Sequence, residues 1–109
     1  MAYDEALAER IRAVVDGEPG LTEKKMFGGL AFLIHGNMSV AASGQGGLLV
    51  HIDADDSDNL LTLPGVRAME MRGRTMRGWL YVDDSVLDDA TFEEWVGRGV
   101  DSARARPPK

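Results

Sequence analysis

Apolar residues alternate with a period of two between Lys24 and Val40, and this alternation predicts a strand, a tight turn and a returning strand. The turn falls at His35-Gly36-Asn37, because glycine and asparagine tolerate positive backbone angles. Both sides of the first strand are apolar, so we expect helices or another chain to cover both. One side carries Met26, Leu30, Phe32 and Ile34, and the other carries Phe27, Ala31 and Leu33.

Two adjacent glycines, Gly28 and Gly29, interrupt this first strand. Glycine has no side chain to pack, and it loses more backbone entropy than other residues when a strand forms. Such residues mark a bulge, a bend, or a place where another group packs against bare backbone. Gly28 and Gly29 are therefore candidates for a structural role and for contact with a partner or ligand.

Three other segments space their apolar residues like amphipathic helices. The first covers about residues 3–16, the second is short and follows the acidic run 53–58, and the third buries a stripe between Phe92 and Val100. Acidic and hydroxyl side chains precede each segment and can cap its free backbone N–H groups. The candidate caps are Asp4, then Asp55 or Ser57, then Ser85 or Asp88.

Short glycine-containing turns separate the remaining β segments, which are expected at about 38–42, 48–52, 66–71 and 75–82. On the last of these, Met76, Gly78, Leu80 and Val82 share one face, and Arg77, Trp79 and Tyr81 share the other. The element order is α-βββ-α-ββ-α. It predicts an α+β fold, a two-layer sandwich with a five-stranded antiparallel sheet.

The length of 109 residues fits one domain, expected over residues 1–102, followed by a flexible tail at 103–109. The chain has no cysteine, which excludes disulfides, thiolate catalysis and zinc–thiolate sites. Neither a signal-peptide pattern nor an apolar run of membrane-spanning length is present in the sequence. We therefore expect a cytoplasmic protein without a membrane partner.

The formal net charge of -6 argues against binding nucleic acid by bulk electrostatics. Arg67, Arg72, Arg74 and Arg77 nevertheless lie close together in the sequence and can form a local basic patch. No recognition-helix pattern accompanies them, so direct sequence-specific nucleic-acid binding is not expected.

Motifs that carry chemistry are weak in this sequence. Residues 44–47 are glycine-rich like a phosphate loop, but a strand follows them where such a loop needs a helix. The acidic run 53–58 lacks the glycine and glutamate of a calcium loop, and is better explained by helix capping. His35 and His51 have no paired carboxylate motif, and Ser43 lacks the nucleophile-elbow context. We therefore expect no catalytic residue, no metal and no cofactor.

The second face of the sheet is the most informative surface in the sequence. If the helices cover one face, the other carries Phe27, Ala31, Leu33, Leu49, Trp79 and Tyr81, bordered by Arg67 and Arg77. Small proteins seldom leave so much contiguous apolar surface in water. Either the terminal helices cover this face, or it is an interface with a partner or a second copy. Met69 is either core filler or part of that surface, because methionine serves both purposes.

Several ordered segments together resemble the TfoX N-terminal domain, which occurs in the TfoX/Sxy bacterial regulators of natural competence. The segments are Lys25-Met26-Phe27-Gly28-Gly29-Leu30-Ala31-Phe32, Gly36-Asn37-Met38, Gly47-Leu48-Leu49-Val50, Pro64-Gly65-Val66 and Met76-Arg77-Gly78-Trp79. The resemblance runs from about Ala6 to Val100 and implies an α+β fold. The full-length regulators carry a further helical domain, which has no counterpart in this sequence.

The resemblance implies a non-enzymatic regulatory role, because the family activates competence genes together with a cyclic-AMP receptor protein at promoters. The expected partner is a protein, with a transcription factor or a second copy of the chain as candidates. The alternative is a small-ligand domain with a cleft near Arg77 and Trp79, where arginine holds an anion and tryptophan stacks on a planar group. The candidate contact residues are Phe27, Gly28, Gly29, Arg67, Met69, Arg77, Trp79 and Tyr81.

Overall fold

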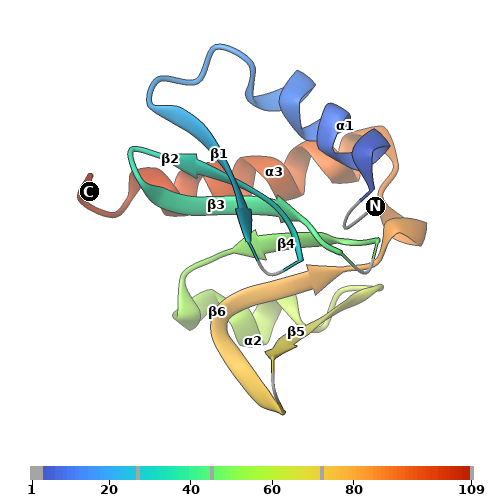
Figure 1. The fold of residues 1–109 in the computed structure, drawn as a ribbon. Helices are drawn as coiled ribbons and strands as arrows, with labels where there is room; N and C mark the ends of the chain where they lie inside the picture. The colour runs from blue at the N-terminus through green and yellow to red at the C-terminus, as the bar shows by residue number, and fades with distance from the viewer. Residues whose placement is uncertain (1–3, 27, 45, 72, 109) are drawn as a thin grey trace.

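The computed structural model describes residues 4–26, 28–44, 46–71 and 73–108 as an α+β fold built on one antiparallel sheet (Figure 1). The sheet has six strands in the order β1-β2-β3-β4-β6-β5. The helices are α1 (Glu5–Val15), η1 (Ala54–Asp56), α2 (Ser57–Leu60), η2 (Asp84–Val86) and α3 (Asp89–Arg104). The strands are β1 (Leu21–Met26), β2 (Gly29–Ile34), β3 (Asn37–Ala42), β4 (Leu48–His51), β5 (Val66–Met71) and β6 (Arg74–Val82).

The expected five-stranded sheet is wrong by one strand, because the first predicted strand is a hairpin. β1 and β2 pair antiparallel from Leu21 opposite Ile34 to Met26 opposite Gly29. Gly28 has a φ of 72°, which is a left-handed angle that favours glycine in a tight turn. Phe27, one of the candidate contact residues, lies outside the described residues. The hairpin is hard to find in the sequence because β1 is largely exposed and polar, with apolar residues only at its ends.

The second turn of the sheet is confirmed at His35-Gly36, where both residues have positive φ angles of 51° and 83°. Asn37, expected to belong to this turn, instead begins β3 and is 1% exposed. Its side-chain amide donates hydrogen bonds to the carbonyl oxygens of Ala103, Arg106 and Pro107, at 3.0 to 3.2 Å. These hydrogen bonds hold the end of α3 and the residues after it against β3. Their acceptors lie beyond the domain boundary that was expected at residue 102.

One face of the sheet is covered by α1 and α3, as the two-layer prediction requires. The core between them contains Leu7 and Ile11 from α1, Trp95 and Val96 from α3, and strand residues such as Phe32. Gly99 lets α3 approach closely, since a Cβ there would lie 2.6 Å from the carbonyl oxygen of Ser39 in β3. The glycine that lowers helix propensity therefore has a packing reason.

Aspartate side chains begin the helices, two of them as predicted. Asp4 accepts hydrogen bonds from the backbone N–H groups of Ala6 and Leu7, and Asp88 accepts one from Thr91 at the start of α3. At α2 the expected caps are wrong. There Asp53 accepts from the N–H of Asp55, because a 3-10 turn precedes the short helix.

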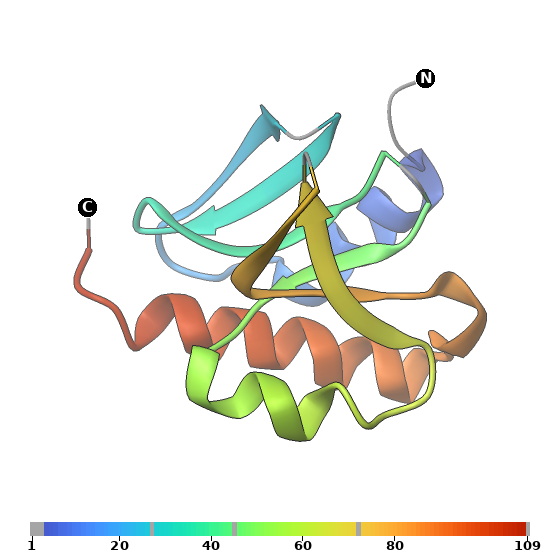
Figure 2. The same cartoon turned by 90° about the horizontal axis from the view of Figure 1, so that it is seen from below.

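The last hairpin, β5–β6, is irregular where the sequence predicts even alternation. Its register shifts between Ala68 and Glu70, and Gly78 in β6 has a φ of 83°. Such an irregularity increases the local bend of a strand. The expected single face shared by Met76, Gly78 and Leu80 is therefore interrupted at Gly78. Figure 2 shows the β1–β2 and β5–β6 hairpins rising on the side of the sheet away from α3.

Replacing Asn37 tests whether its buried amide anchors the end of α3. Asn37→Ala is expected to lower the free energy of unfolding by about 1–3 kcal/mol, because carbonyl groups lose their donor. Asn37→Asp should cost more, since a carboxylate would face the carbonyl oxygens of Ala103, Arg106 and Pro107. Urea unfolding measures both. Asn59→Asp, at an exposed position, is the control and should change stability by less than about 0.5 kcal/mol.

Candidate functional site

The face of the sheet opposite α1 and α3, called the helix-free face below, carries a second apolar cluster. All its members come from strands, so no described helix contributes to it. The members are Ala31, Ala41, Leu49, Met69, Trp79 and Tyr81, with Met26, Leu33 and Met38 packed against them. The structure thus brings together Met69, Trp79 and Tyr81 from the candidate contact residues.

The alternative in which the terminal helices cover this face is wrong, yet little of the apolar cluster is open to water. Trp79 and Tyr81 are each only 8% exposed, and Leu49 is 4% exposed. The strands themselves supply the cover, because both outer hairpins rise on this side of the sheet (Figure 2). The aromatic rings at the centre of the face are therefore largely shielded from solvent, and its exposed residues lie at the rim.

Trp79 packs against His51, which also contacts the helical layer. The two residues are opposite each other in the β4–β6 pairing, and their rings meet edge to face with centroids 4.9 Å apart. The Nδ1 atom of His51 lies 3.1 Å from Oγ of Ser102 on α3. His51 therefore connects the helix-free cluster to the helical layer, which explains a half-buried histidine at the end of β4.

Tyr81 is covered by a guanidinium group and lies against a glycine. The Cζ atom of Arg67 is 4.2 Å from the centre of the Tyr81 ring, in cation–π geometry. A Cβ at Gly47 would stand 2.3 Å from the ring, so this position in the β3–β4 turn admits only glycine without a shift of Tyr81. Arg67, Tyr81, Asp83 and Ser85 border a hollow of about 370 Å³ at this edge of the sheet.

The two glycines of the first hairpin have different roles. Gly28 is exposed, and a Cβ there would meet nothing within 4 Å. Gly29 is buried, and a Cβ there would stand 2.0 Å from the carbonyl oxygen of Ala42 and 3.2 Å from the backbone nitrogen of Gly44. Gly28 thus lies in a turn. Gly29 marks a place where another group packs against bare backbone, which is one of the alternatives expected for this pair.

Charge is distributed unequally between the two faces of the sheet. Lys24 is opposite Ala31, a member of the helix-free cluster, and Arg67 stacks on Tyr81. Among the described strand residues, the acids are Glu23 and Glu70, which alternate with Lys24 and Met69. Glu23 instead receives two hydrogen bonds of 2.8 Å from Arg12 of α1, which lower its pKa. Lys24 and Arg67 thus lie on the helix-free face, and the carboxylate of Asp83, just after β6, lines the same hollow as Arg67.

Asp83 follows β6 and lies near this rim. Its pKa is lowered, mainly because the carboxylate accepts hydrogen bonds from the backbone and side chain of Ser85, with a smaller contribution from the charge of Arg67. The side chain of Arg77 is not described, although its backbone belongs to β6. The expected cleft between Arg77 and Trp79 therefore stays a prediction, and Phe27 lies outside the described residues.

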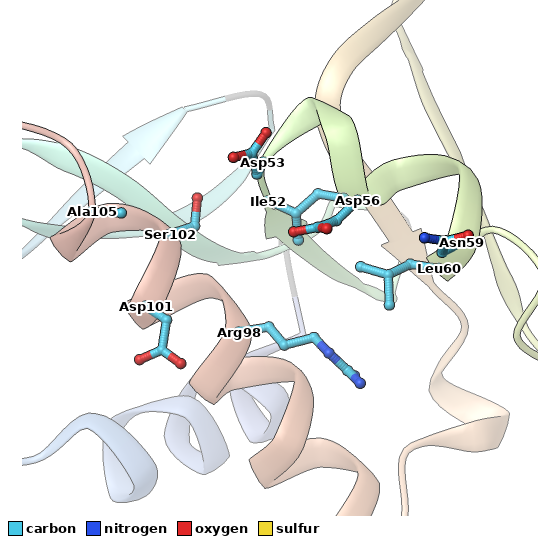
Figure 3. A pocket seen from close by; sticks show the side chains of 9 residues that line it. All are labelled: Ile52, Asp53, Asp56, Asn59, Leu60, Arg98, Asp101, Ser102 and Ala105. Carbon is cyan, nitrogen blue, oxygen red and sulfur yellow. The ribbon is translucent and has the colours of Figure 1, made fainter.

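A groove between α2 and α3 is absent from the sequence-based expectations. Figure 3 shows Asp56 and Leu60 pointing toward α3, and Arg98 extending from α3 toward α2. The groove has a volume of about 400 Å³, and its lining residues lie between positions 52 and 60 and between positions 98 and 105. Only the packing of these two distant segments creates it, so no local motif could indicate it.

Within the described ranges, no group of three or more His, Asp or Glu side chains is arranged to hold a metal ion. The same ranges hold no buried side-chain nitrogen or oxygen without a hydrogen-bond partner. None of the helices described is at once long enough and apolar enough to cross a membrane.

These features define a small α+β domain whose antiparallel sheet has helices on one face and a strand-built apolar cluster on the other. The chain matches the family model of the TfoX N-terminal domain over residues 14–103. It therefore belongs to the TfoX N-terminal domain family, and the resemblance seen in the sequence is confirmed. No curated protein and no solved structure matches the chain.

Alanine at the two hairpin glycines separates the turn from the close approach. Gly29→Ala should lower the free energy of unfolding by about 2–3 kcal/mol, because its Cβ forces β2 away from Ala42. Gly28→Ala should cost only about 1 kcal/mol, from the left-handed φ angle alone. Thermal or urea unfolding measures both. Equal losses would contradict the assignment of different roles.

The lowered pKa of Asp83 predicts a pH-dependent contribution to stability. The carboxyl is bound in the folded state, so its contribution is complete above its ordinary pKa of 3.8 and is lost as the pH falls through the folded-state pKa. The stability advantage of the wild type over Asp83→Asn should therefore shrink as the pH falls below about 4. Unfolding curves at a series of pH values measure it, with Asp84→Asn as the control for losing one negative charge.

Proposed function

We propose that this chain is a non-enzymatic regulatory domain that binds a protein partner at the rim of its helix-free face. Membership in the TfoX N-terminal domain family supports a role like that of the competence regulators. The observation that carries the proposed surface is the charge pattern. A chain with net charge -6 carries Lys24 and Arg67 on this face, and the carboxylate beside Arg67, that of Asp83, already accepts a hydrogen bond from Ser85.

The burial of the aromatic rings favours a polar, reversible contact over an obligate one. Obligate interfaces resemble a domain core cut in half, whereas Trp79 and Tyr81 are almost fully buried in the single chain. A partner segment with carboxylates can pair with Lys24 and Arg67, and the stacked Arg67 is pre-organised for such a contact. The preferred partner is an acidic segment of a transcription factor, and a second copy of the chain is the less favoured alternative.

The expected partner class is the cyclic-AMP receptor protein with which this family activates competence genes. Binding of the purified receptor protein from the same bacterium is measured by calorimetry at two salt concentrations. Lys24→Glu should weaken binding by about tenfold and reduce the salt dependence, because a rim cation is lost. Lys25→Glu is the matched control: it makes the same charge change on the next residue, whose position alternates with Lys24 in β1.

Two outcomes would contradict this proposal. Equal loss of affinity in Lys24→Glu and Lys25→Glu would show that only net charge matters. Sedimentation of the chain alone as a dimer that Lys24→Glu dissociates would assign the rim to self-association.

Small-ligand binding is the second candidate, and its best support is the hollow beside Arg67. A guanidinium stacked on the ring of Tyr81, beside Ser85, can hold a small anion. The affinity for such a ligand would depend on Arg67 and Ser85 and would be unchanged by Lys24→Glu. Calorimetry with inorganic phosphate on the wild type, Arg67→Ala and Lys24→Glu distinguishes it from a protein partner.

A further inference from the structure

The groove between α2 and α3, called the α2–α3 groove below, lies in the helical layer and is independent of the helix-free face. Its apolar lining includes the buried Ile52 and the half-buried Leu60, which form what is called its floor below. Leu60 is half-buried, and Figure 3 shows its side chain directed at the gap between the helices. An aliphatic or aromatic side chain of another molecule can therefore be buried there with a gain in free energy.

The rim of the groove is acidic. Asp53, Asp56 and Asp101 line it, and they come from the link between β4 and η1, from η1 and from α3. All three side chains belong to exposed residues. None of them takes part in the ion pairs found among the described residues.

Arg98, the cationic side chain that lines the groove, is already paired with a carboxylate of its own helix. Arg98 donates a 2.8 Å hydrogen bond to Glu94 and lies 4.7 Å from the centre of the Trp95 ring. Its charge is thus balanced within α3. Asp56 holds the N-cap position of α2, yet its side chain makes no capping hydrogen bond, and its carboxylate points into the groove (Figure 3). The rim therefore has unbalanced negative charge above an apolar floor.

We propose that the α2–α3 groove binds a basic amphipathic segment of a partner protein. An apolar side chain of that segment rests on Leu60 and Ile52, and flanking lysines or arginines meet the carboxylates of Asp56 and Asp101. Both parts of this pattern contribute, because Leu60 and Ile52 offer apolar contact and Asp56 and Asp101 offer charge. A groove between two helices is a common receptor for the apolar face of a partner helix. The charge complementarity excludes an acidic segment or a nucleic-acid backbone as the occupant.

The test uses a fluorescein-labelled amphipathic peptide with leucines on one helical face and lysines on the other. Its binding to the wild-type chain is measured by fluorescence anisotropy. The same peptide with serine in place of leucine tests the floor, and the peptide with glutamate in place of lysine tests the rim. The Lys/Leu peptide should bind at least about tenfold more tightly than either control.

Variants of the chain locate the binding. Asp56→Lys with Asp101→Lys should weaken Lys/Leu peptide binding by about tenfold or more, and Asp56→Asn with Asp101→Asn by a smaller factor. Asp84→Lys with Glu93→Lys is the matched control, since it makes the same change of net charge at exposed residues that do not line the groove. All of these positions are exposed, and circular dichroism verifies that the variants fold.

Three results would overturn the proposal. One is equal weakening by the groove variant and its charge-matched control, which would indicate non-specific attraction to an acidic protein. Another is equal affinity for the serine and leucine peptides. A third is complete competition by spermidine at an affinity matching the peptide's, which would identify a small-amine site in place of a peptide groove.

Discussion

The structure depends on one constraint: a sheet with apolar residues on both faces has helices for only one of them. The helices α1 and α3 bury the sheet face that holds Phe32 and Val50. The remaining apolar cluster, with Trp79 and Tyr81, must be buried by the sheet itself. The sheet bends over this cluster, and the register shift in the β5–β6 pairing near Gly78 allows the bend. Close packing also leaves no room for a Cβ at Gly29, beside Ala42, or at Gly47, beside Tyr81.

Much of the fold can be predicted from local patterns. The N-terminal caps Asp4 and Asp88, the buried stripe of α3 and the bounds of β5 all depend on neighbouring residues, and all are confirmed. The strand count was wrong because β1 is an exposed edge strand, in which period-two alternation of apolar residues is not required. The even alternation of β6 was wrong because Gly78 was treated as an ordinary strand residue, while its φ of 83° reflects contacts with neighbouring strands.

The candidate site was predicted less completely, for a physical reason. The sequence identified Trp79 and Tyr81, because aromatic residues at alternating positions of one strand are visible as a pattern. It identified Arg67 as a residue that borders them. It overestimated their exposure, since burial depends on how far the sheet bends, which no single strand reveals. It missed the α2–α3 groove entirely, because Leu60 and Asp101 are 41 positions apart and meet only in the packed structure.

The net charge of -6 conceals a division between two surfaces of opposite character. Glu23 is bound by Arg12 on the helical side, which leaves Lys24 without a neighbouring strand acid on the other side. The carboxylates of Asp53, Asp56 and Asp101 border the helical layer instead. An acidic protein can therefore attract an acidic segment at one face and a basic segment at the other. This requires that the paired charges lie closer together than the screening length of about 8 Å at physiological salt. His51 lies between these surfaces, with its ring against Trp79 and its Nδ1 atom near Ser102 at the edge of the groove. The ring of His51 is therefore a contact that joins the helical layer to the centre of the helix-free cluster.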